Sequence, residues 1–466
     1  MVRVAGGDRS RTSWRFGARI VIVIVRALSP LLLVICSCSS APETPRHLIL
    51  VTIDTLRQDR IGAYGHSDAR TPHLDALAAR GTRFDDAISQ AITTPPSHAS
   101  ILTGLAPTTH GLTQLFGQRL PDRNRTLAEI LSETGFETAA FVSAVPLRKD
   151  VGLDQGFGSY DDEGLRWRNR TRSASDTNTR VKRWLEEPHT GRLFIWVHYF
   201  EPHFPYAPPA SYQDKFGRAD DLVGVEPLNA FGRNERLSPF VVDAVSRLYD
   251  GEVATGDAAL GELLAALSNA KILDDAIVAV VADHGESLGE RGYYFGHWDV
   301  FDETARVPLV IARPDGHFAG TSVEGPVAST DLLPTLLAWL EVPVPAEVEG
   351  IDLTPTIERG TGDPRRVIYT ERSQFMKPTI RSVRDGRWLV VQRRNREPRF
   401  YDRRTGDEAE LPPHEAGVLL DELEGYEMRA KATRSVPSQV SEKVAEQLRA
   451  LGYAQDLTEA SSAASQ

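Results

Sequence analysis

The chain has 466 residues, of which 41% are hydrophobic and 25% are charged. This composition is typical of a globular protein and excludes a largely disordered one, and the length predicts two or three domains. The formal net charge is −11, and without residues 1–37 it is −16, because that segment carries six arginines and one aspartate. Such an acidic balance argues against a nucleic-acid partner. Both cysteines, Cys36 and Cys38, lie near the N-terminus, so the rest of the chain has no disulfide, thiol nucleophile or cysteine metal ligand.

The N-terminal segment, residues 1–37, predicts an export signal. Five arginines precede a largely apolar run at residues 20–35, which Arg26 interrupts. A basic segment followed by a short apolar one is typical of a secretory signal, and Arg26 makes the run a poor transmembrane helix. Residues 35–39, Ile-Cys-Ser-Cys-Ser, resemble a bacterial lipobox in which Cys38 is acylated; a plain cleaved signal or an uncleaved anchor is the alternative. We therefore expect an exported bacterial protein, periplasmic or at the cell surface, anchored to the membrane by a lipid on Cys38.

Strands and helices are predicted to alternate through the middle of the chain. Residues 47–53 are almost continuously apolar, as are strands buried on both faces of a sheet. Further strands are predicted at residues 138–143, 193–197, 276–282 and 307–312. Helices are predicted at residues 71–81, at 126–135 behind a Thr126–Glu129 capping box, and at about 243–267. This order predicts an α/β fold with a mostly parallel sheet sandwiched by helices.

The pattern changes near residue 365, where a small C-terminal α+β subdomain is predicted. Short antiparallel strands are expected at residues 379–384, 387–392 and 399–402, with Asp385-Gly386 as a hairpin turn, and a helix is expected at about 437–451. The expected segments are a leader at 1–37, a catalytic domain at 45–364, the C-terminal subdomain at 365–455 and a disordered tail at 456–466.

The segment from Thr94 to Gly104, Thr-Pro-Pro-Ser-His-Ala-Ser-Ile-Leu-Thr-Gly, predicts a helix with Thr94 at or just before its N-terminus. Pro96 suits a first helical turn, and Gly104 suits a helix end. The N–H groups and the dipole at a helix N-terminus favour an anion. A hydroxyl there can become a nucleophile if a metal or a base lowers its pKa; a simple N-cap role is the alternative.

Polar residues follow three of the predicted strands, at Asp54, His198 and Asp283, and His284 comes next to the last of these. In open α/β sheets, ligands bind at the carboxyl ends of the strands. Asp54, Asp283, His284 and a hydroxyl form a set of oxygen and nitrogen ligands that suits Mn²⁺, Zn²⁺ or Mg²⁺. An ordinary loop after the strand is the alternative for the Asp283-His284 pair.

Two further histidines, His203 and His297, lie in predicted loops. A histidine near a strand end can donate to an anionic ester or protonate a leaving group. For a single loop histidine, a structural role is the alternative.

Several short motifs follow one another between residues 47 and 453. They are Ile53-Asp54-Thr55-Leu56-Arg57 with Ala63-Tyr64-Gly65, the segment from Thr94 to Gly104, Pro202-His203-Phe204-Pro205, Asp283-His284-Gly285, Arg306-Val307-Pro308-Leu309, and Leu448 to Tyr453. In this order they resemble motifs of the sulfatase family, within the alkaline phosphatase superfamily. The second is similar to the sulfatase signature Cys/Ser-x-Pro-Ser-Arg followed by Thr-Gly, and the fourth to the metal motif. The resemblance implies the sulfatase fold.

The chain departs from the sulfatase pattern at four positions of the implied site. Thr94 stands where sulfatases convert a Cys or Ser to formylglycine, which a secondary alcohol cannot form. His98 replaces the signature arginine, Thr55 replaces the second aspartate of a frequent pair, and His297 stands near the expected lysine. These departures are similar to those of superfamily relatives with a threonine nucleophile, namely phosphatases, phosphodiesterases and headgroup transferases.

The resemblance implies a metal-dependent hydrolase of sulfate or phosphate esters, acting on a small-molecule, glycan or lipid ester. It implies one divalent ion, Mn²⁺, Zn²⁺ or Mg²⁺ rather than Ca²⁺, with Asp54, Thr94, Asp283 and His284 as ligands. The implied catalytic residues are the nucleophile Thr94 together with His98, His203 and His297. Two alternatives stay open: a phosphoethanolamine-type headgroup transferase, and a non-catalytic protein that keeps the fold and the metal.

Overall fold

The computed structural model describes residues 44–166, 171–217, 237–374, 377–393, 396–409, 416–432 and 436–437. The expected leader with Cys36 and Cys38, the expected tail at 456–466, and the expected helix at 437–451, apart from its first residue, lie outside these ranges. Within them, no helix combines the length and the apolar character needed to cross a membrane.

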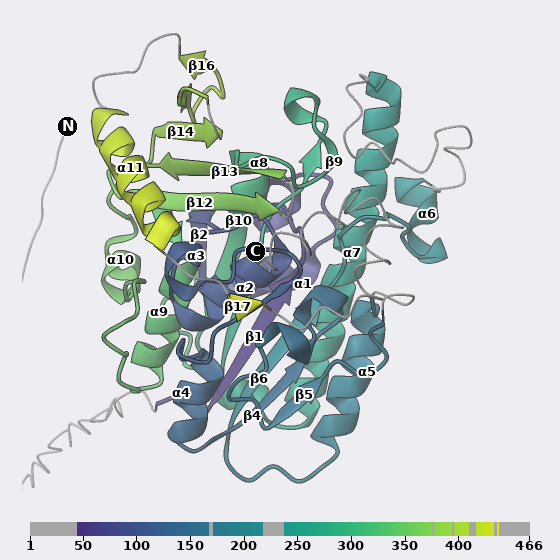
Figure 1. The fold of residues 1–466 in the computed structure, drawn as a ribbon. Helices are drawn as coiled ribbons and strands as arrows, with labels where there is room; N and C mark the ends of the chain where they lie inside the picture. Colours follow the sequence, from purple (N-terminus) through teal and green to yellow (C-terminus); the bar gives the residue numbers. More distant parts are fainter. Residues whose placement is uncertain are drawn as a thin grey trace, which may run out of the picture. The chain divides into compact units, whose positions relative to one another are not determined.

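The main sheet has eight strands in the order β11-β2-β10-β7-β1-β6-β4-β5 (Figure 1). Their bounds are β1 His47–Ile53, β2 Thr82–Ile88, β4 Phe136–Phe141, β5 Ser159–Asp161, β6 Arg192–Tyr199, β7 Ala276–Ala282, β10 Arg306–Ala312 and β11 Thr321–Ala328. The central strand β1 runs parallel to β6 on one side and to β7 on the other, whereas β10 is antiparallel to both of its neighbours. All residues of β1 and β7 are buried, which explains their continuous apolar runs. The predicted mostly parallel sheet is confirmed.

Helices cover both faces of this sheet (Figure 1). On one side lie α1 (Pro72–Arg80), α5 (Ala174–Leu185) and the long α7 (Pro239–Asn269), with α6 (Ala210–Phe216) packed on α7. On the other side lie α2 (Thr94–Thr103), α3 (Pro107–His110), α4 (Leu127–Glu133), α9 (Leu332–Trp339) and α10 (Thr354–Arg359). The capping box predicted at Thr126 and Glu129 is present, and α2 ends as predicted at Gly104, which has φ 68°.

A second, antiparallel sheet is formed by the C-terminal part of the chain. Its strands, in order, are β12 Ile368–Gln374, β13 Lys377–Arg384, β14 Trp388–Arg393, β15 Arg399–Asp402 and β16 Glu408–Ala409. The three predicted strands correspond to β13, β14 and β15, whereas β12, β16 and helix α11 (Gly417–Ala432) were not predicted. Pro437, expected to begin a helix, instead lies in β17 (Val436–Pro437), which pairs with β3 (Gln118–Arg119).

A hydrophobic cluster joins the two sheets. Ile92, Val300, Phe301 and Ala305 come from the main part of the chain, and Ile380, Leu389, Val391 and Tyr401 come from the second sheet. The cluster therefore belongs to neither sheet alone, and both sheets fall within one compact unit.

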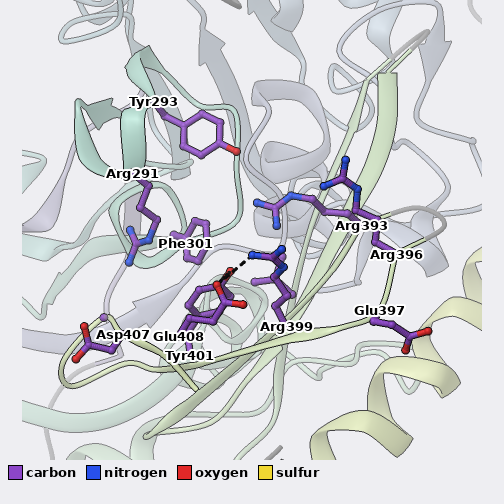
Figure 2. Close-up of a pocket in the computed structure, with 12 residues that line it drawn as sticks. Arg291, Tyr293, Phe301, Arg393, Arg396, Glu397, Arg399, Tyr401, Asp407 and Glu408 are labelled. Carbon is purple, nitrogen blue, oxygen red and sulfur yellow. Dashed lines mark hydrogen bonds and ion pairs between the residues drawn. The ribbon is translucent and has the colours of Figure 1, made fainter. Parts of the chain in front are cut away.

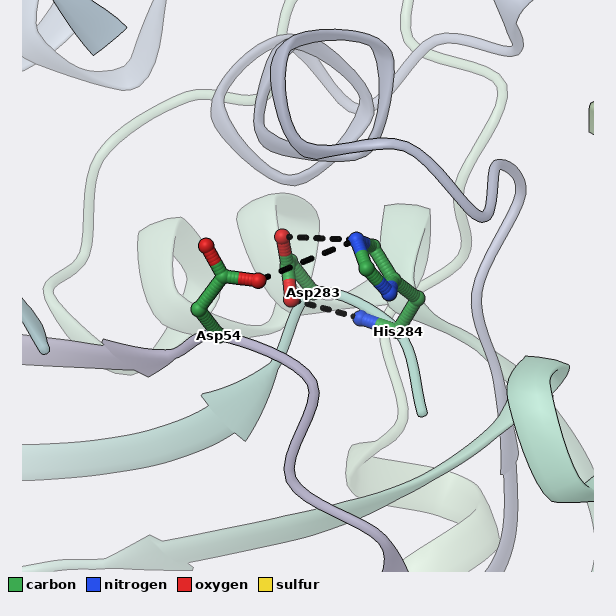
Figure 3. A group of neighbouring side chains, drawn as sticks. All are labelled: Asp54, Asp283 and His284. Carbon is green, nitrogen blue, oxygen red and sulfur yellow. Dashed lines mark hydrogen bonds and ion pairs between the residues drawn. The ribbon is translucent and has the colours of Figure 1, made fainter. Parts of the chain in front are cut away.

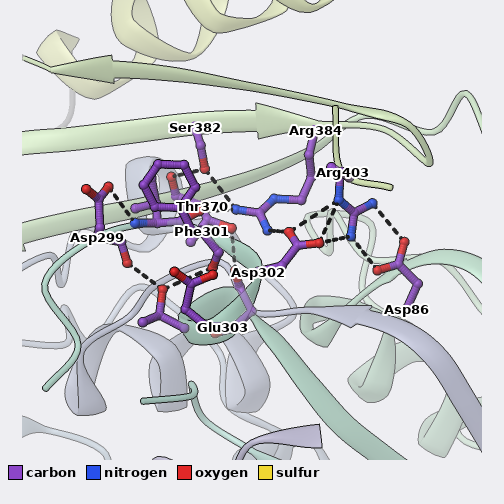
Figure 4. Close-up of polar contacts among 12 residues, drawn as sticks. Asp86, Asp299, Phe301, Asp302, Glu303, Thr370, Ser382, Arg384 and Arg403 are labelled. Carbon is purple, nitrogen blue, oxygen red and sulfur yellow. Dashed lines mark hydrogen bonds and ion pairs between the residues drawn. The ribbon is translucent and has the colours of Figure 1, made fainter. Parts of the chain in front are cut away.

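Ion pairs reinforce this junction (Figure 4). Asp302, at the start of α8 (Asp302–Ala305), accepts a hydrogen bond from Nη1 of the fully buried Arg384 at 2.8 Å. The Asp302 carboxylate also lies 3.1 Å and 3.2 Å from Nε of Arg403, whose Nη1 donates to Asp86 at 2.9 Å. Although burial alone would raise it, the charges of Arg403 and Arg384 lower the pKa of Asp302 to about 2.

Candidate active site

Three strands bring the polar residues of the candidate site to one edge of the main sheet. Asp54 follows β1, Asp283 follows β7, and His198 is the second-last residue of β6. Because β6 and β7 are the two parallel neighbours of β1, their carboxyl ends meet. Asp54, His198, Asp283 and the adjacent His284 are all buried. The pairing of these strands thus explains why residues far apart in the sequence come together.

Asp54, Asp283 and His284 form a group that could hold a metal ion (Figure 3). Their ligand atoms lie within 4.8 Å of one another, and Nε2 of His284 is 3.4 Å from Oδ2 of Asp283 and 3.9 Å from Oδ1 of Asp54. In the described part of the chain, none of these three atoms has a hydrogen-bond partner. Buried polar atoms are normally satisfied, so three unsatisfied ones facing each other fit a cation.

Burial perturbs the acid–base properties of the same three residues. It raises the pKa of Asp283 to about 6 and, with the charge of Asp283, raises the pKa of Asp54 well above its usual range. Burial lowers the pKa of His284 to about 3, which keeps its imidazole neutral. A neutral imidazole and two desolvated carboxyl groups are the donor set that a divalent ion would stabilise.

Neighbouring groups orient the free atoms of these ligands. Oδ1 of Asp283 accepts hydrogen bonds from the backbone N–H groups of Thr55 at 3.2 Å and His284 at 2.8 Å, which leaves Oδ2 free. Nδ1 of His284 donates to the carbonyl of Gly285 at 3.0 Å, which leaves the lone pair of Nε2 free. Thr55 has φ 55°, and the Tyr249 hydroxyl donates to its carbonyl at 2.7 Å. The Tyr249 hydroxyl therefore helps to hold Thr55 in a left-handed backbone conformation, which is unfavourable for threonine.

Helix α2 starts beside this group. Thr94 is its first residue and is buried, and Thr93 precedes it as N-cap without a side-chain capping bond. The Ser97 hydroxyl donates to the carbonyl of Asp283 at 2.6 Å, which fixes the first turn of α2 to the end of β7. The helix N-terminus predicted at Thr94 is confirmed, and its N–H groups and dipole favour an anion there.

The protein encloses the His98 side chain, so its ring does not lie where it could contact substrate. Its Nδ1 donates to the carbonyl of Thr94 at 2.8 Å, and its Nε2 lies 3.0 Å from the Thr52 hydroxyl, so both ring nitrogens have protein partners. The side chain is fully buried, and Nδ1 is 3.7 Å from Oδ2 of Asp283. The geometry gives His98 a positioning role between Thr94 and Asp283.

The rings of His203 and His297 lie close to each other, and the His297 ring lies close to that of His284. The ring centroid of His297 is 4.3 Å from that of His284 and 5.9 Å from that of His203. Nδ1 of His297 donates to the carbonyl of Ile92 at 2.7 Å, and Nδ1 of His203 to the carbonyl of Phe204 at 2.6 Å. Burial lowers the pKa of His203 to about 4 and that of His297 well below its usual range. Both rings are therefore neutral at pH 7, with Nε2 available to accept a proton.

His198 was recognised in the sequence as a residue at a strand end, but no role was assigned to it. Its Nδ1 lies 2.8 Å from the Ser143 hydroxyl, and its Nε2 lies 3.7 Å from Oδ2 of Asp54. Among the described residues this Nε2 has no hydrogen-bond partner. The two oxygens of Asp54 thus face two imidazoles, those of His284 and His198. The position of His198 after an apolar run, like that of Asp54, was the available signal.

A mostly parallel sheet sandwiched by helices, with an aspartate- and histidine-containing group at the carboxyl ends of its strands, is the arrangement of the alkaline phosphatase superfamily. The sulfatase family model matches residues 46–342, and the chain belongs to the sulfatase family. It is 27% identical over 377 residues to an ulvan-active sulfatase of Formosa agariphila, covering 72% of this chain and 71% of that protein. It is 24% identical over 395 residues to an arylsulfatase of Clostridium perfringens, covering 70% and 81% respectively.

Solved structures support the same fold. The phosphonate monoester hydrolase of Agrobacterium radiobacter superposes with a TM-score of 0.68 at 22% identity, over 84% of this chain and 96% of the other. At 22% identity, the similarity between the two proteins shows a shared fold only. The family of the chain is one of ester hydrolases.

Proposed function

We propose that the protein is a metal-dependent hydrolase of sulfate or phosphate esters in which Thr94 is the nucleophile. The observation that carries this proposal is the set of three buried, unpartnered ligand atoms beside the start of α2. A divalent ion bound by Asp54, Asp283, His284 and the Thr94 hydroxyl would stabilise negative charge on the ester and lower the pKa of that hydroxyl. Mn²⁺, Zn²⁺ or Mg²⁺ suits such a set better than Ca²⁺, which prefers about six to eight oxygen ligands.

The reaction proceeds in two displacements. Oγ1 of Thr94 attacks the sulfur or phosphorus in line, and the bond to the ester oxygen breaks. The proton lost by Thr94 is balanced by one gained by the leaving oxygen, and Nε2 of His203 or His297 is the group that can carry it. Water then attacks the same sulfur or phosphorus, which restores the Thr94 hydroxyl and releases sulfate or phosphate.

The identity of the nucleophile favours phosphate over sulfate esters. A formylglycine sulfatase can release sulfate by collapse of its hemiacetal, which breaks a bond of the enzyme's own side chain. Thr94 cannot form that group, so a sulfated Thr94 must be cleaved by attack at sulfur. A phosphorylated threonine is cleaved by an ordinary in-line displacement at phosphorus. The sulfatase relatives support the reaction class, and the phosphonate monoester hydrolase fold is compatible with phosphorus chemistry.

The test is a comparison of kcat/KM for p-nitrophenyl sulfate, p-nitrophenyl phosphate and bis(p-nitrophenyl) phosphate, with Mn²⁺ or Zn²⁺ supplied. We expect a phosphate ester to react faster, with loss of turnover in Thr94→Ala. Release of phosphate to water, and not to an added alcohol, distinguishes the hydrolase from a headgroup transferase. A clear preference for the sulfate ester, with Thr94 unmodified by mass spectrometry, would contradict the phosphate preference. Absence of turnover on all three esters would contradict the hydrolase itself.

A further inference from the structure

Two carboxylates of other elements hold the loop that carries His203. This loop follows β6 and leads to α6. The hydroxyl of the buried Tyr206 donates to Oε2 of Glu286 at 3.1 Å. The backbone N–H of Ala207 donates to Oε1 of the buried Glu252, in α7, at 2.7 Å. The loop is therefore fastened to the rest of the protein just after His203.

The Tyr206 ring lies where the His203 loop meets α7 and β9 (Tyr294–Gly296). Its centroid is 5.4 Å from that of Tyr249 in α7 and 6.2 Å from that of Phe295 in β9, and both ring pairs meet edge to face. Its hydroxyl reaches Glu286, in the loop after β7 that also carries two of the candidate metal ligands. One side chain thus joins the His203 loop to three other parts of the candidate site.

The stretch of chain between Glu286 and Phe295 also depends on Tyr206. A cavity of about 490 Å³ lies against the second sheet, and Arg291 and Tyr293 of this stretch line part of it (Figure 2). Tyr206 contacts both ends of the stretch, one by its hydrogen bond to Glu286 and the other by its contact with the ring of Phe295. Tyr206 therefore fixes both ends of this stretch to the His203 loop.

The contacts of the His203 ring within its own loop orient the ring but do not place it. Nδ1 of His203 donates to the carbonyl of Phe204 at 2.6 Å, and the ring stacks on that of Phe200 with 4.6 Å between centroids. Because Phe200 and Phe204 belong to the same loop, they set the direction of Nε2 only relative to that loop. The place of Nε2 in the candidate site then depends on the anchors of the loop, Tyr206 and Glu252.

Resting on the function proposed above, we propose that Tyr206 and Glu252 are positioning residues that place His203 at the leaving oxygen of the ester. Nε2 of His203 accepts the proton that the Thr94 hydroxyl loses, and gives it to the leaving oxygen as the bond from phosphorus or sulfur to that oxygen breaks. In the second displacement the same nitrogen takes a proton from the attacking water and returns one to Thr94. A loop displaced by about 1 Å loses this transfer and leaves the candidate metal group intact.

Leaving groups of different basicity separate a positioning role from a structural one. p-Nitrophenolate is weakly basic and leaves without an acid, whereas the more basic phenolate needs a proton. The substrates are therefore p-nitrophenyl and phenyl phosphate, or the two sulfates if wild type prefers sulfates, with Mn²⁺ supplied. The variants are Tyr206→Phe, Glu252→Ala and Glu252→Gln, the last of which keeps a hydrogen-bond acceptor for Ala207. The matched control is Tyr212→Phe, because the Tyr212 hydroxyl, in α6, also donates to α7, at the carbonyl of Ala254 at 3.3 Å.

In Tyr206→Phe and Glu252→Ala we expect kcat/KM for the phenyl ester to fall about tenfold to a hundredfold, and that for the p-nitrophenyl ester by less than about threefold. Glu252→Gln and Tyr212→Phe should keep both rates, and all four variants should bind Mn²⁺ as wild type does. In a chain with His203→Ala, adding Tyr206→Phe should not slow the phenyl ester further.

Equal losses on the two esters, no loss on either, or additive losses in the chain with both substitutions would overturn the positioning role in an otherwise active enzyme. Absence of turnover of every ester by wild type would instead refute the proposed function, and with it the proton transfer assigned to His203.

Discussion

Replacing Asp302 with Asn is expected to destabilise the protein by about 2 to 3 kcal/mol. The Asp302 carboxylate is the partner of two buried guanidiniums, those of Arg384 and Arg403. These charges lower its pKa to about 2, and a displacement of that size from the ordinary aspartate value near 4 corresponds to about 2 to 3 kcal/mol. Removing one partner of a buried pair costs about 3 to 5 kcal/mol. The lower end of that range applies because asparagine still offers a hydrogen-bond acceptor and because Arg403 keeps Asp86 as an ion-pair partner.

Urea unfolding measures this loss as a lower midpoint with an unchanged slope. The control is Asp363→Asn, which breaks the exposed pair with Arg365 and should change the free energy of unfolding by less than about 1 kcal/mol. Because the folded pKa of Asp302 lies below its unfolded value, the stabilisation is complete above about pH 5 and is lost as pH falls from 4 towards 2. The difference between wild type and Asp302→Asn should therefore shrink in acid. Equal effects of the two substitutions, or a difference that grows in acid, would refute the reasoning.

Four further predictions concern the site and the N-terminus. Thr94→Ala should abolish ester turnover and Thr94→Ser should keep part of it, with the unfolding midpoint little changed; wild-type turnover in Thr94→Ala would make water the direct nucleophile. Elemental analysis after native purification should find close to one divalent ion per chain, and two tightly bound ions would contradict the single ligand set. His198→Asn should weaken Mn²⁺ binding by about tenfold to a hundredfold in calorimetry, whereas the exposed His317→Gln should not; equal affinities would mean that the His198 imidazole, whose Nε2 lies 3.7 Å from Oδ2 of Asp54, does not contribute to the candidate metal group. Metabolic fatty-acid labelling should depend on Cys38, and label on Cys36, or none, would mean a different leader.

The strands that are buried on both faces of the main sheet could be predicted, because such burial requires a continuous run of apolar residues. The strands β1 and β7 are buried throughout, so the sequence shows each of them as an apolar run. The same runs predict that Asp54 and Asp283 lie at the ends of these strands. β2 was not predicted, because its sequence Thr-Arg-Phe-Asp-Asp-Ala-Ile carries three charged residues that are only partly buried. Only its pairing with β10 and β11 identifies it as a strand.

The sequence predicted which residues form the candidate site, but not which of their side chains contact one another. The four-residue spacing of Thr94 and His98 is compatible with the hydrogen bond observed within α2, whereas the partner of the other ring nitrogen, Thr52, lies 46 residues earlier. For His198, the relevant neighbour is Asp54, which only the pairing of β1 with β6 brings close. Long-range pairing thus decided which histidines face the candidate metal ligands and which are enclosed by protein.

The shared cluster between the two sheets has a consequence for engineering this protein. A chain cut before β12 would leave Ile92, Val300 and Phe301 uncovered, and an uncovered apolar surface of this kind promotes aggregation. A second sheet grafted from a relative would have to match both the cluster and the Asp86–Arg403 pair. The junction also holds the segment just beyond His297, so such a graft would disturb the candidate catalytic loop.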